Sequence, residues 1–347
     1  MPKTILLTGG AGFIGSNFVR FALEHRDDTI INLDCLTYSG NLENLAGLED
    51  HPCYEFVHGD IRDADTVAPL MERADCVVHM AAESHVDRSI LDSGPFIDSN
   101  IRGTQVLLDA ARKAKGGSGV GRFVYVSTDE LYGSLPLDKP ELMFTEDTPI
   151  QANSPYAASK AAGDLLCRAY HHTFGMDIVT TRCSNNFGPY QFPEKVIPLF
   201  VSNILEGKKL PLYGDGLNVR DWLHVDDHCE AILAALDHGT SGEAYNVGGN
   251  NERSNLELTT SILSIMGKGE DMIERVTDRP GHDRRYAIDA SKIKRDLGWE
   301  PSRSAWPAAL EQTVKWYVDN EPWWRNVKSG AYRDYYEQQY KGRAATS

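Results

Sequence analysis

The sequence predicts an α/β fold, a doubly wound parallel sheet with a smaller C-terminal α/β domain. Three observations support this prediction. Apolar segments of strand length alternate with longer amphipathic segments from the first residues onward, a glycine-rich turn follows the first apolar segment, and Pro and Gly become frequent after about residue 186. Alternating strands and helices build parallel sheets with helices on both faces, and their ligands bind beyond the carboxyl ends of the strands.

The order of the expected elements suggests where the two domains divide. Five strands are expected early in the chain, at residues 4–8, 29–34, 55–58, 76–80 and 122–127, and residues 177–182 and 244–247 are further short candidates. We expect a first domain at residues 1–185, rejoined by the strand near 244–247, and a second domain mainly at residues 186–347. The Gly-rich stretch at 115–121 is expected to be a surface loop.

Composition excludes several kinds of protein. A formal charge of −15 argues against a nucleic-acid surface, which needs clustered Lys and Arg. No run is apolar and long enough to cross a bilayer, and the first residues lack the features of a signal peptide, so we expect a cytoplasmic location. The six cysteines have no Cys-x-x-Cys spacing, which favours reduced thiols over disulfides or a zinc site, and no metal is expected.

The turn after the first strand has the glycine spacing of a dinucleotide site. Gly9 permits the tight turn, Gly12 lets a pyrophosphate approach backbone N–H groups at a helix N-terminus, and Gly15 lets the helix pack closely on the strand. The helix is expected to begin at Ser16. Because the motif joins a strand to a helix, it predicts a Rossmann-type domain rather than an ordinary loop.

An acidic residue at the end of the second strand indicates which dinucleotide binds. Asp34 stands at the distance expected for the carboxylate that binds the adenosine ribose hydroxyls, and Cys35 follows where an Arg or Lys would favour NADP. We therefore expect NAD. Asp60 and Ile61, after the third strand, could flank the adenine.

Tyr156 and Lys160 form a candidate catalytic pair. They are four residues apart in a segment where Pro155 suits a helix start, so they share one helical face. A free tyrosine has a pKa of about 10, and a nearby lysine together with a cationic nicotinamide can stabilise its phenolate as a base near neutrality. Ser127 and Thr128, at the end of the fifth strand, make the pair more specific than its spacing alone.

With these motifs the chain resembles the extended short-chain dehydrogenase/reductase family. The resemblance extends to one branch, the nucleotide-sugar 4,6-dehydratases, through blocks that span nearly the whole chain. They lie at residues 13–14, 34–41, 79–89, 127–130, 182–190, 218–222 and 278–282. Cys35, Ser99 and the 115–121 loop depart from the pattern of the branch. We expect these departures to affect affinity for the adenine end of the cofactor more than the chemistry.

Asp129 and Glu130 distinguish this branch from related epimerases and decarboxylases. Removing water across carbons 5 and 6 of a hexose needs a base for the carbon 5 proton and an acid for the carbon 6 hydroxyl. Two carboxyl groups can divide these tasks if their environments separate their pKa values. The resemblance implies that Glu130 is the base and Asp129 the acid, with Thr128, Tyr156 and Lys160 completing the catalytic group.

The resemblance implies a substrate and a reaction. The expected substrate is dTDP-glucose, which becomes the 4-keto-6-deoxy sugar as hydride passes from carbon 4 to NAD and returns at carbon 6. A 4,6-dehydratase of another nucleotide hexose such as UDP-glucose, a nucleotide-sugar 4-epimerase, and an NAD-sensing scaffold protein are the alternatives. The residues leave the choice between thymine and uracil open.

The resemblance also carries binding residues onto this sequence. Besides the residues named above, it implies a cofactor site with Phe13, Ile14, Cys35, Leu36, Thr37, Ala81, Ala82, Ser99 and Asn186. It implies a substrate site with Ser84, Thr128, Asn185, Lys195, Val196, Pro211, Leu212, Tyr213, Arg220, Asn255, Arg279 and His282.

Two expectations concern packing. Relatives pair through a four-helix contact, so a homodimer is expected through the alanine-rich helix after Tyr156 and an apolar-periodic helix at 101–111. An aromatic tail is expected to pack against the smaller domain; its members are Trp316, Tyr317, Trp323, Trp324, Tyr332, Tyr335, Tyr336 and Tyr340.

Overall fold

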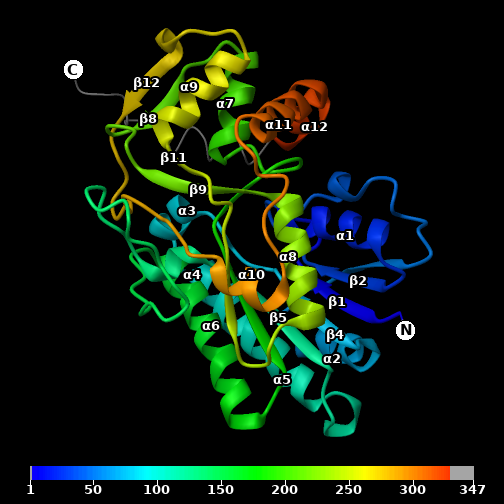
Figure 1. Ribbon diagram of the computed structural model, residues 1–347. Coiled ribbons are helices and arrows are strands. Elements are labelled where there is room, and N and C mark those ends of the chain that lie inside the picture. Colours follow the sequence, from blue (N-terminus) through cyan, green and yellow to red (C-terminus); the bar gives the residue numbers. More distant parts are fainter. Residues whose placement is uncertain (1, 329–347) are drawn as a thin grey trace.

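In the computed structural model, which describes residues 2–328, the main sheet has seven strands and all its neighbouring pairs are parallel (Figure 1). The strand order is β10-β6-β5-β4-β1-β2-β3. The strands are β1 (Thr4–Thr8), β2 (Thr29–Asp34), β3 (Tyr54–His58), β4 (Cys76–His79), β5 (Arg122–Thr128), β6 (Ile178–Cys183) and β10 (Ala244–Val247). The order reverses between β1 and β4, and such a reversal opens a binding crevice at the carboxyl ends of the strands.

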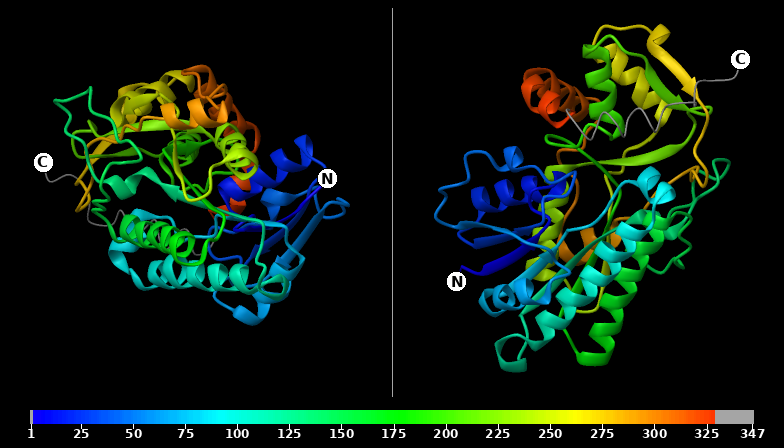
Figure 2. Two further views of the ribbon diagram at one scale, coloured as in Figure 1. Left: turned by 60° about the horizontal axis from the view of Figure 1, so that its bottom comes forward. Right: turned by 180° about the vertical axis from the view of Figure 1, so that it is seen from behind.

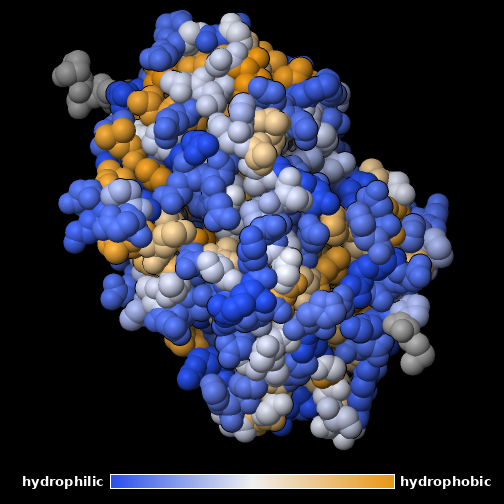
Figure 3. All heavy atoms as spheres, viewed as in Figure 1, coloured by the Kyte–Doolittle hydropathy of each residue, from blue (hydrophilic) through white to orange (hydrophobic). Residues whose placement is uncertain are grey.

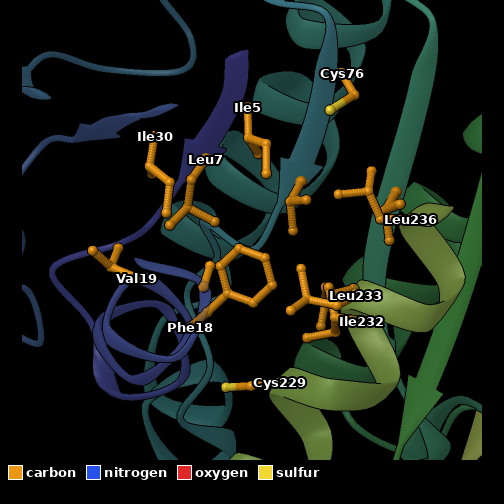
Figure 4. Packing of buried hydrophobic residues seen from close by; sticks show 14 of the residues in the cluster. Ile5, Leu7, Phe18, Val19, Ile30, Cys76, Cys229, Ile232, Leu233 and Leu236 are labelled. Carbon is orange, nitrogen blue, oxygen red and sulfur yellow. The ribbon is translucent and has the colours of Figure 1, made fainter. Parts of the chain in front are cut away.

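Helices cover both faces of this sheet, as the two views of Figure 2 show. They are α1 (Phe13–His25), α2 (Ala64–Arg73), α5 (Thr104–Lys113), α6 (Pro155–Phe174) and α8 (Val225–His238), whereas α3 (Val86–Leu91) and α4 (Gly94–Phe96) pack against α6. α1 and α8 pack on one face, and α2, α5 and α6 pack on the other. In Figure 4, Phe18 of α1 and Ile232 of α8 meet beside Leu7 of β1. Each such buried side chain stabilises the fold by about 1.5–3 kcal/mol.

A smaller C-terminal part carries two further sheets. In the order β11-β9-β7, β9 pairs antiparallel with β11 and parallel with β7, and β12 pairs parallel with β8. The strands are β7 (Asn185–Phe187), β8 (Leu210–Tyr213), β9 (Val219–His224), β11 (Glu252–Ser254) and β12 (Ile273–Val276). Its helices are α7 (Val196–Leu205), α9 (Asn255–Ile265), α11 (Ala308–Asp319) and α12 (Glu321–Val327), whereas α10 (Ser291–Leu297) packs against β10 and α8 of the main sheet. Phe187, Trp222, Leu310, Tyr317 and Trp324 are buried together in its core.

Short helical turns complete the chain. They are η1 (Leu42–Leu45), η2 (Ile97–Gly103), η3 (Lys115–Gly117), η4 (Asp129–Tyr132) and η5 (Glu270–Met272). The η2 turn is π-helical and runs directly into α5, so the helix expected from residue 101 begins earlier. The 115–121 stretch holds η3 and is largely exposed.

The predicted fold class is confirmed, with small shifts in the ends of its elements. α1 begins at Phe13 rather than at Ser16, because Gly12 already serves as the N-cap. β5 extends to Thr128, and β6 spans Ile178–Cys183 rather than residues 177–182. Ala244–Val247 forms β10 and pairs in parallel with β6.

The aromatic residues near the C-terminus lie at the core of the smaller part. Trp316 and Tyr317 are on α11, and Trp323 and Trp324 are on α12. Tyr332, Tyr335, Tyr336 and Tyr340 lie outside the described residues. Hydrophilic side chains predominate over α8 and α10 on the face in Figure 3. Within residues 2–328, no helix combines the length and apolar character needed to cross a membrane.

Candidate active site

A cleft opens at the carboxyl ends of the central strands, and most of the predicted site residues line it. The predicted residues found there are Gly9, Gly12, Phe13, Ile14, Gly15, Asp34, Cys35, Thr37, Asp60, Ile61, Ala81, Ala82, Ser84, Ser99, Thr128, Asp129, Glu130, Tyr156, Lys160, Asn185, Asn186 and Lys195. The sheet topology therefore brings segments from the first two hundred residues into one site.

The glycine loop has the geometry of a phosphate cradle. Gly9 has a φ of +80°, which favours glycine, and a Cβ at Gly15 would lie 2.1 Å from the carbonyl oxygen of Gly9. A Cβ at Gly12 would meet only that oxygen, at 3.4 Å. Gly12 caps α1, and Phe13, Ile14 and Gly15 of its first turn line the cleft, where the first N–H groups of a helix have no partner within it. The loop thus fits a dinucleotide pyrophosphate.

Asp34 is fixed beside this loop. Its Oδ2 accepts a hydrogen bond from the N–H of Ala11 at 2.9 Å, and its Oδ1 accepts one from Leu36 at 2.8 Å. Burial raises the pKa of the carboxyl despite these two bonds. Leu36 itself does not line the cleft, and its φ of +51° belongs to the turn that carries the chain past Asp34. Its contact with the ribose hydroxyls of the cofactor stays a prediction.

Asp60 has a partner that sequence reasoning did not consider. Arg62 donates to both carboxylate oxygens of Asp60, and this side-chain pairing lowers the pKa of Asp60. The guanidinium of Arg62 is therefore paired with a carboxylate and does not offer a free cation for the 2′-phosphate of NADP. With Asp34 and Cys35 close by, this end of the cleft fits NAD.

Tyr156 and Lys160 lie on the first turns of α6. Ser154 caps this helix by accepting from the N–H of Ala157 at 3.1 Å. The Nζ of Lys160 donates to the carbonyl oxygen of Val126 at 2.6 Å, and burial lowers its pKa to about 8. Burial, and next the charge of Glu130, raise the pKa of Tyr156 well above its ordinary value. The phenol needs positive charge nearby before it can act as a base.

Thr128, Asp129 and Glu130 follow directly from β5. The Thr128 hydroxyl accepts from the N–H of Glu130 at 3.3 Å, and the nearby Thr128 side chain lowers the pKa of the Tyr156 phenol against the larger effect of burial. Asp129 is 1% exposed, and its Oδ2 has no hydrogen-bond partner among the described residues. A buried carboxyl oxygen with no protein partner is suited to a substrate group.

The two carboxyl groups have different surroundings. Burial raises the pKa of Asp129 well above its ordinary value, and the charges of Glu130 and Asp221 add to that effect. Burial also raises the pKa of Glu130, but Arg279, Arg220 and Lys195 oppose it. The neighbours therefore act in opposite directions, favouring the protonated form of Asp129 and the charged form of Glu130, as an acid and a base require.

Part of the predicted substrate site does not line the cleft. These residues are Val196, Pro211, Leu212, Tyr213, Arg220, Asn255, Arg279 and His282. Among them, Arg279 donates to Asp87 at 2.9 Å and the Tyr213 hydroxyl donates to the same carboxylate at 3.2 Å. The rings of Tyr213 and His282 are 6.0 Å apart. Asn255 begins α9, and Leu212 is buried against Gly216. Their contacts with substrate stay predictions.

Several residues that line the cleft escaped the sequence analysis, notably Glu83, Gln191, Phe192 and Glu194. Glu194 accepts from the Tyr38 hydroxyl at 2.9 Å and from Arg88 at 3.2 Å. A signal for two of them was present, because Glu83 lies within the 79–89 block and Glu194 precedes Lys195. Gln191 and Phe192 carried none, since their loop reaches the cleft only through tertiary packing.

Comparisons with known proteins find close relatives. A family model described as GDP-mannose 4,6 dehydratase matches residues 6–307. A dTDP-glucose 4,6-dehydratase from Streptomyces niveus is 52% identical, with 94% of this chain and 96% of the relative covered. Another from Salmonella typhimurium is 48% identical, with 98% and 99% covered.

Solved structures of two reaction types share this fold. A dTDP-glucose 4,6-dehydratase from Streptomyces venezuelae, with NAD and TYD bound, gives a TM-score of 0.90 at 51% identity, over 94% of this chain and 100% of that chain. A UDP-glucose 4-epimerase from Thermotoga maritima, with UDP-glucose, gives 0.82 at 29% identity, over 92% and 99%. The higher identity lies with the dehydratase.

Proposed function

This chain belongs to the dTDP-glucose 4,6-dehydratases of the NAD-dependent epimerase/dehydratase family, and on that premise we propose how its residues divide the reaction. The enzyme removes water from dTDP-glucose with NAD as its cofactor. The observation that supports our division of roles is the carboxyl pair of buried Asp129 and half-buried Glu130, which line one cleft with Tyr156.

Tyr156 takes the proton of the carbon 4 hydroxyl as the sugar is oxidised. NAD, when bound, supplies the redox chemistry by taking the hydride of carbon 4 and later returning it to carbon 6. Lys160, one helical turn after Tyr156, offers the positive charge that a buried phenolate needs. Thr128 lines the cleft with Tyr156 and lowers the pKa of the phenol.

Glu130 and Asp129 then carry out the elimination. The ketone at carbon 4 acidifies the carbon 5 proton, which Glu130 removes as a carboxylate. Asp129 holds a proton and gives it to the departing carbon 6 hydroxyl, which leaves as water. As hydride returns to carbon 6, Glu130 gives a proton back to carbon 5 and is a carboxylate again. The three nearby cations favour the charged form of Glu130, whereas Asp221 and Glu130 favour the protonated form of Asp129.

The nucleotide diphosphate requires positive charge in or beside the cleft. Lys195 lines the cleft and donates to the carbonyl oxygen of Ser84 at 3.2 Å. Arg220 and Arg279 do not line it, and Arg279 is paired with Asp87, but the charge of each opposes the rise in the pKa of Glu130. We assign these three cations to the diphosphate, because charge-assisted hydrogen bonds suit phosphate oxygens.

We also propose a homodimer in the cytoplasm. The surface of α3, η2 and α6 exposes Leu91, Ile97, Leu165 and Phe174, each at 50% or more. An apolar surface over neighbouring helices is typical of an interface between subunits, and the α5–α6 pair could meet its symmetric copy there. The charge of −15 is consistent with a protein that acts on small molecules away from nucleic acid.

An isotope experiment tests the complete cycle. dTDP-glucose that carries deuterium at carbon 4 should give a 4-keto-6-deoxy product with that deuterium at carbon 6, because the hydride is returned within the cleft. In heavy water, solvent deuterium should enter carbon 5. A 4-epimerase would give a product of unchanged mass, and label that washes out or stays at carbon 4 would contradict the mechanism.

Two variants separate the roles of the carboxyl groups. Glu130→Gln should block solvent exchange at carbon 5 and water loss, yet some oxidation at carbon 4 should persist as increased absorbance of reduced cofactor, since Tyr156 and Lys160 remain. Asp129→Asn should slow elimination more than oxidation. Dehydration at the normal rate by Glu130→Gln would refute its role as the base.

A further inference from the structure

Trp323 connects the C-terminal helix α12 to η1, the short helical turn that follows β2. Its indole Nε1–H donates to the Oδ1 of Asn44 at 2.9 Å, across 279 positions of sequence. Asn44 lies on η1 and is 2% exposed. In Figure 1, and from behind in Figure 2, α12 lies close above α1 and the loop that follows β2. This contact therefore crosses between the two parts of the molecule.

Asn44 passes the connection on to the glycine loop. Its Nδ2 donates to the carbonyl oxygen of Ala11 at 2.9 Å, and the N–H of Ala11 donates to the Oδ2 of Asp34 at 2.9 Å. The orientation of the Asn44 amide is fixed by its partners, because an indole can only donate and a carbonyl can only accept. Three successive hydrogen bonds thus run from Trp323 to the carboxylate at the ribose end of the cleft.

Aromatic packing holds the start of this chain in place. The rings of Trp316 and Trp323 are 5.3 Å apart, and both lie edge-on to Tyr190, at 4.7 Å and 5.7 Å. Arg20 lies 5.3 Å from the Tyr190 ring and donates to the backbone carbonyl of Asn44 at 2.8 Å. Asn44 is therefore held through both its side chain and its backbone.

We propose that Trp323 is a positioning residue for the dinucleotide. By holding Asn44, it keeps Ala11 and Asp34 in the arrangement that receives the pyrophosphate and the adenosine ribose. NAD takes a hydride from the sugar and returns it later in the same cycle, so it must stay bound between the two steps. If the cofactor dissociates in between, the oxidised sugar cannot be converted to product. α12 thereby slows the loss of NAD, although it lies outside the cleft.

Trp323→Phe tests the proposal, because it keeps an aromatic ring in the cluster and removes the N–H donor, while the control below loses the same ring volume. Loss of this bond also leaves the buried Oδ1 of Asn44 without its donor, so NAD should bind about tenfold more weakly. The measurements are calorimetry of NAD binding to stripped protein and the rate of NAD release, with thermal unfolding without NAD alongside. At saturating NAD, kcat should stay within about twofold of the wild type, as expected when a single distant bond affects binding alone.

Trp324→Phe is the matched control. Trp324 is the next residue of the same helix, and its indole also donates a bond of 2.9 Å, but to the carbonyl oxygen of Tyr317 within the C-terminal part. This variant should lower the unfolding temperature and leave NAD affinity unchanged. If both variants weaken NAD equally, or if Trp323→Phe binds NAD like the wild type, the proposal is wrong.

A second variant tests the middle of the chain. Asn44→Asp keeps an acceptor for Trp323 but replaces the amide donor to Ala11, so it should also weaken NAD binding. Because both changes interrupt one chain of bonds, the double variant should lose less affinity than the two single losses combined. Full additivity would show that Trp323 and Asn44 act independently, which contradicts the proposal.

Discussion

Burial is the first reason why the titratable groups of the cleft depart from their ordinary pKa values. It raises the pKa of Asp129, Glu130 and Tyr156 and lowers that of Lys160, because each group is more easily neutral away from water. Neighbouring charges then give Asp129 and Glu130 different pKa shifts, although burial alone raises the pKa of both. Asp221, which accepts from the N–H groups of Gly249 and Asn251, adds negative charge on the side of Asp129.

Tyr156→Phe should abolish most of the turnover and leave the cofactor bound. The change removes the ionisable oxygen and keeps the ring, so turnover should fall by about a hundred- to ten-thousandfold, the usual contribution of positioned proton transfer. Stopped-flow measurement of the oxidation step and calorimetry with NAD check this. Tyr245→Phe is the control, since its buried hydroxyl accepts from the N–H of Thr240 away from the cleft and its loss should spare turnover.

Asp129→Asn should stabilise the fold, and more so at higher pH. The pKa of Asp129 is higher in the native state than its ordinary value of 3.8 in the unfolded chain. The native state therefore binds the proton more tightly, and this stabilisation is present at low pH. It is lost as the pH rises from 3.8 through the native pKa. An amide does not titrate. The unfolding temperature should therefore exceed that of the wild type by about 2 °C or more at pH 8, with little difference at pH 4.

The control for this prediction is a carboxyl whose pKa shifts the other way. Hydrogen bonds from Arg284 lower the pKa of Asp215 to about 2, so Asp215→Asn should bring no gain in stability at pH 8. A drop in the unfolding temperature of Asp129→Asn at pH 8 would mean that the native state does not disfavour that carboxylate.

At the scale of elements, local chemistry was predictable from sequence and long-range contacts were not. The glycine loop and the start of α6 depend on neighbours in the chain, so Gly9 and Tyr156 could be placed without a structure. The pairing of Arg62 with Asp60 belongs to no sequence motif, so the sequence analysis did not predict it. The bond from Trp323 to Asn44 depends on how two distant parts dock, which periodicity does not report.

Two glycine substitutions should separate the packing of α1 from its role in binding. An added Cβ at Gly15 would lie 2.1 Å from the Gly9 carbonyl, so Gly15→Ala should cost about 1–3 kcal/mol of stability together with NAD affinity. At Gly12 the new methyl group meets only an oxygen at 3.4 Å and faces the cleft. Gly12→Ala should keep the unfolding temperature without NAD and lose NAD binding. Equal behaviour of the two variants would contradict this assignment.

At the scale of the whole molecule, the proposed dimer predicts a particle of twice 38.6 kDa by sedimentation at micromolar concentration. Leu165→Glu, on the exposed side of α6, should give a monomer, because it places a charge in an apolar interface. Leu217→Glu introduces the same change at an exposed leucine of the C-terminal part and should leave the dimer intact. A wild-type monomer, or a dimer that survives Leu165→Glu, would exclude this interface.

The place of β10 in the main sheet has a consequence for how the protein is made. β10 is the edge strand of the main sheet beside β6, and α8 covers the same face of that sheet as α1. Both elements are synthesised after β7, α7, β8 and β9 of the smaller part. A ribosome that has delivered only the first two hundred residues therefore presents an unpaired strand edge and an uncovered apolar layer, both of which attract other chains. The nascent chain needs protection from aggregation until α8 and β10 emerge, and a gene cut between β6 and α8 should yield insoluble protein.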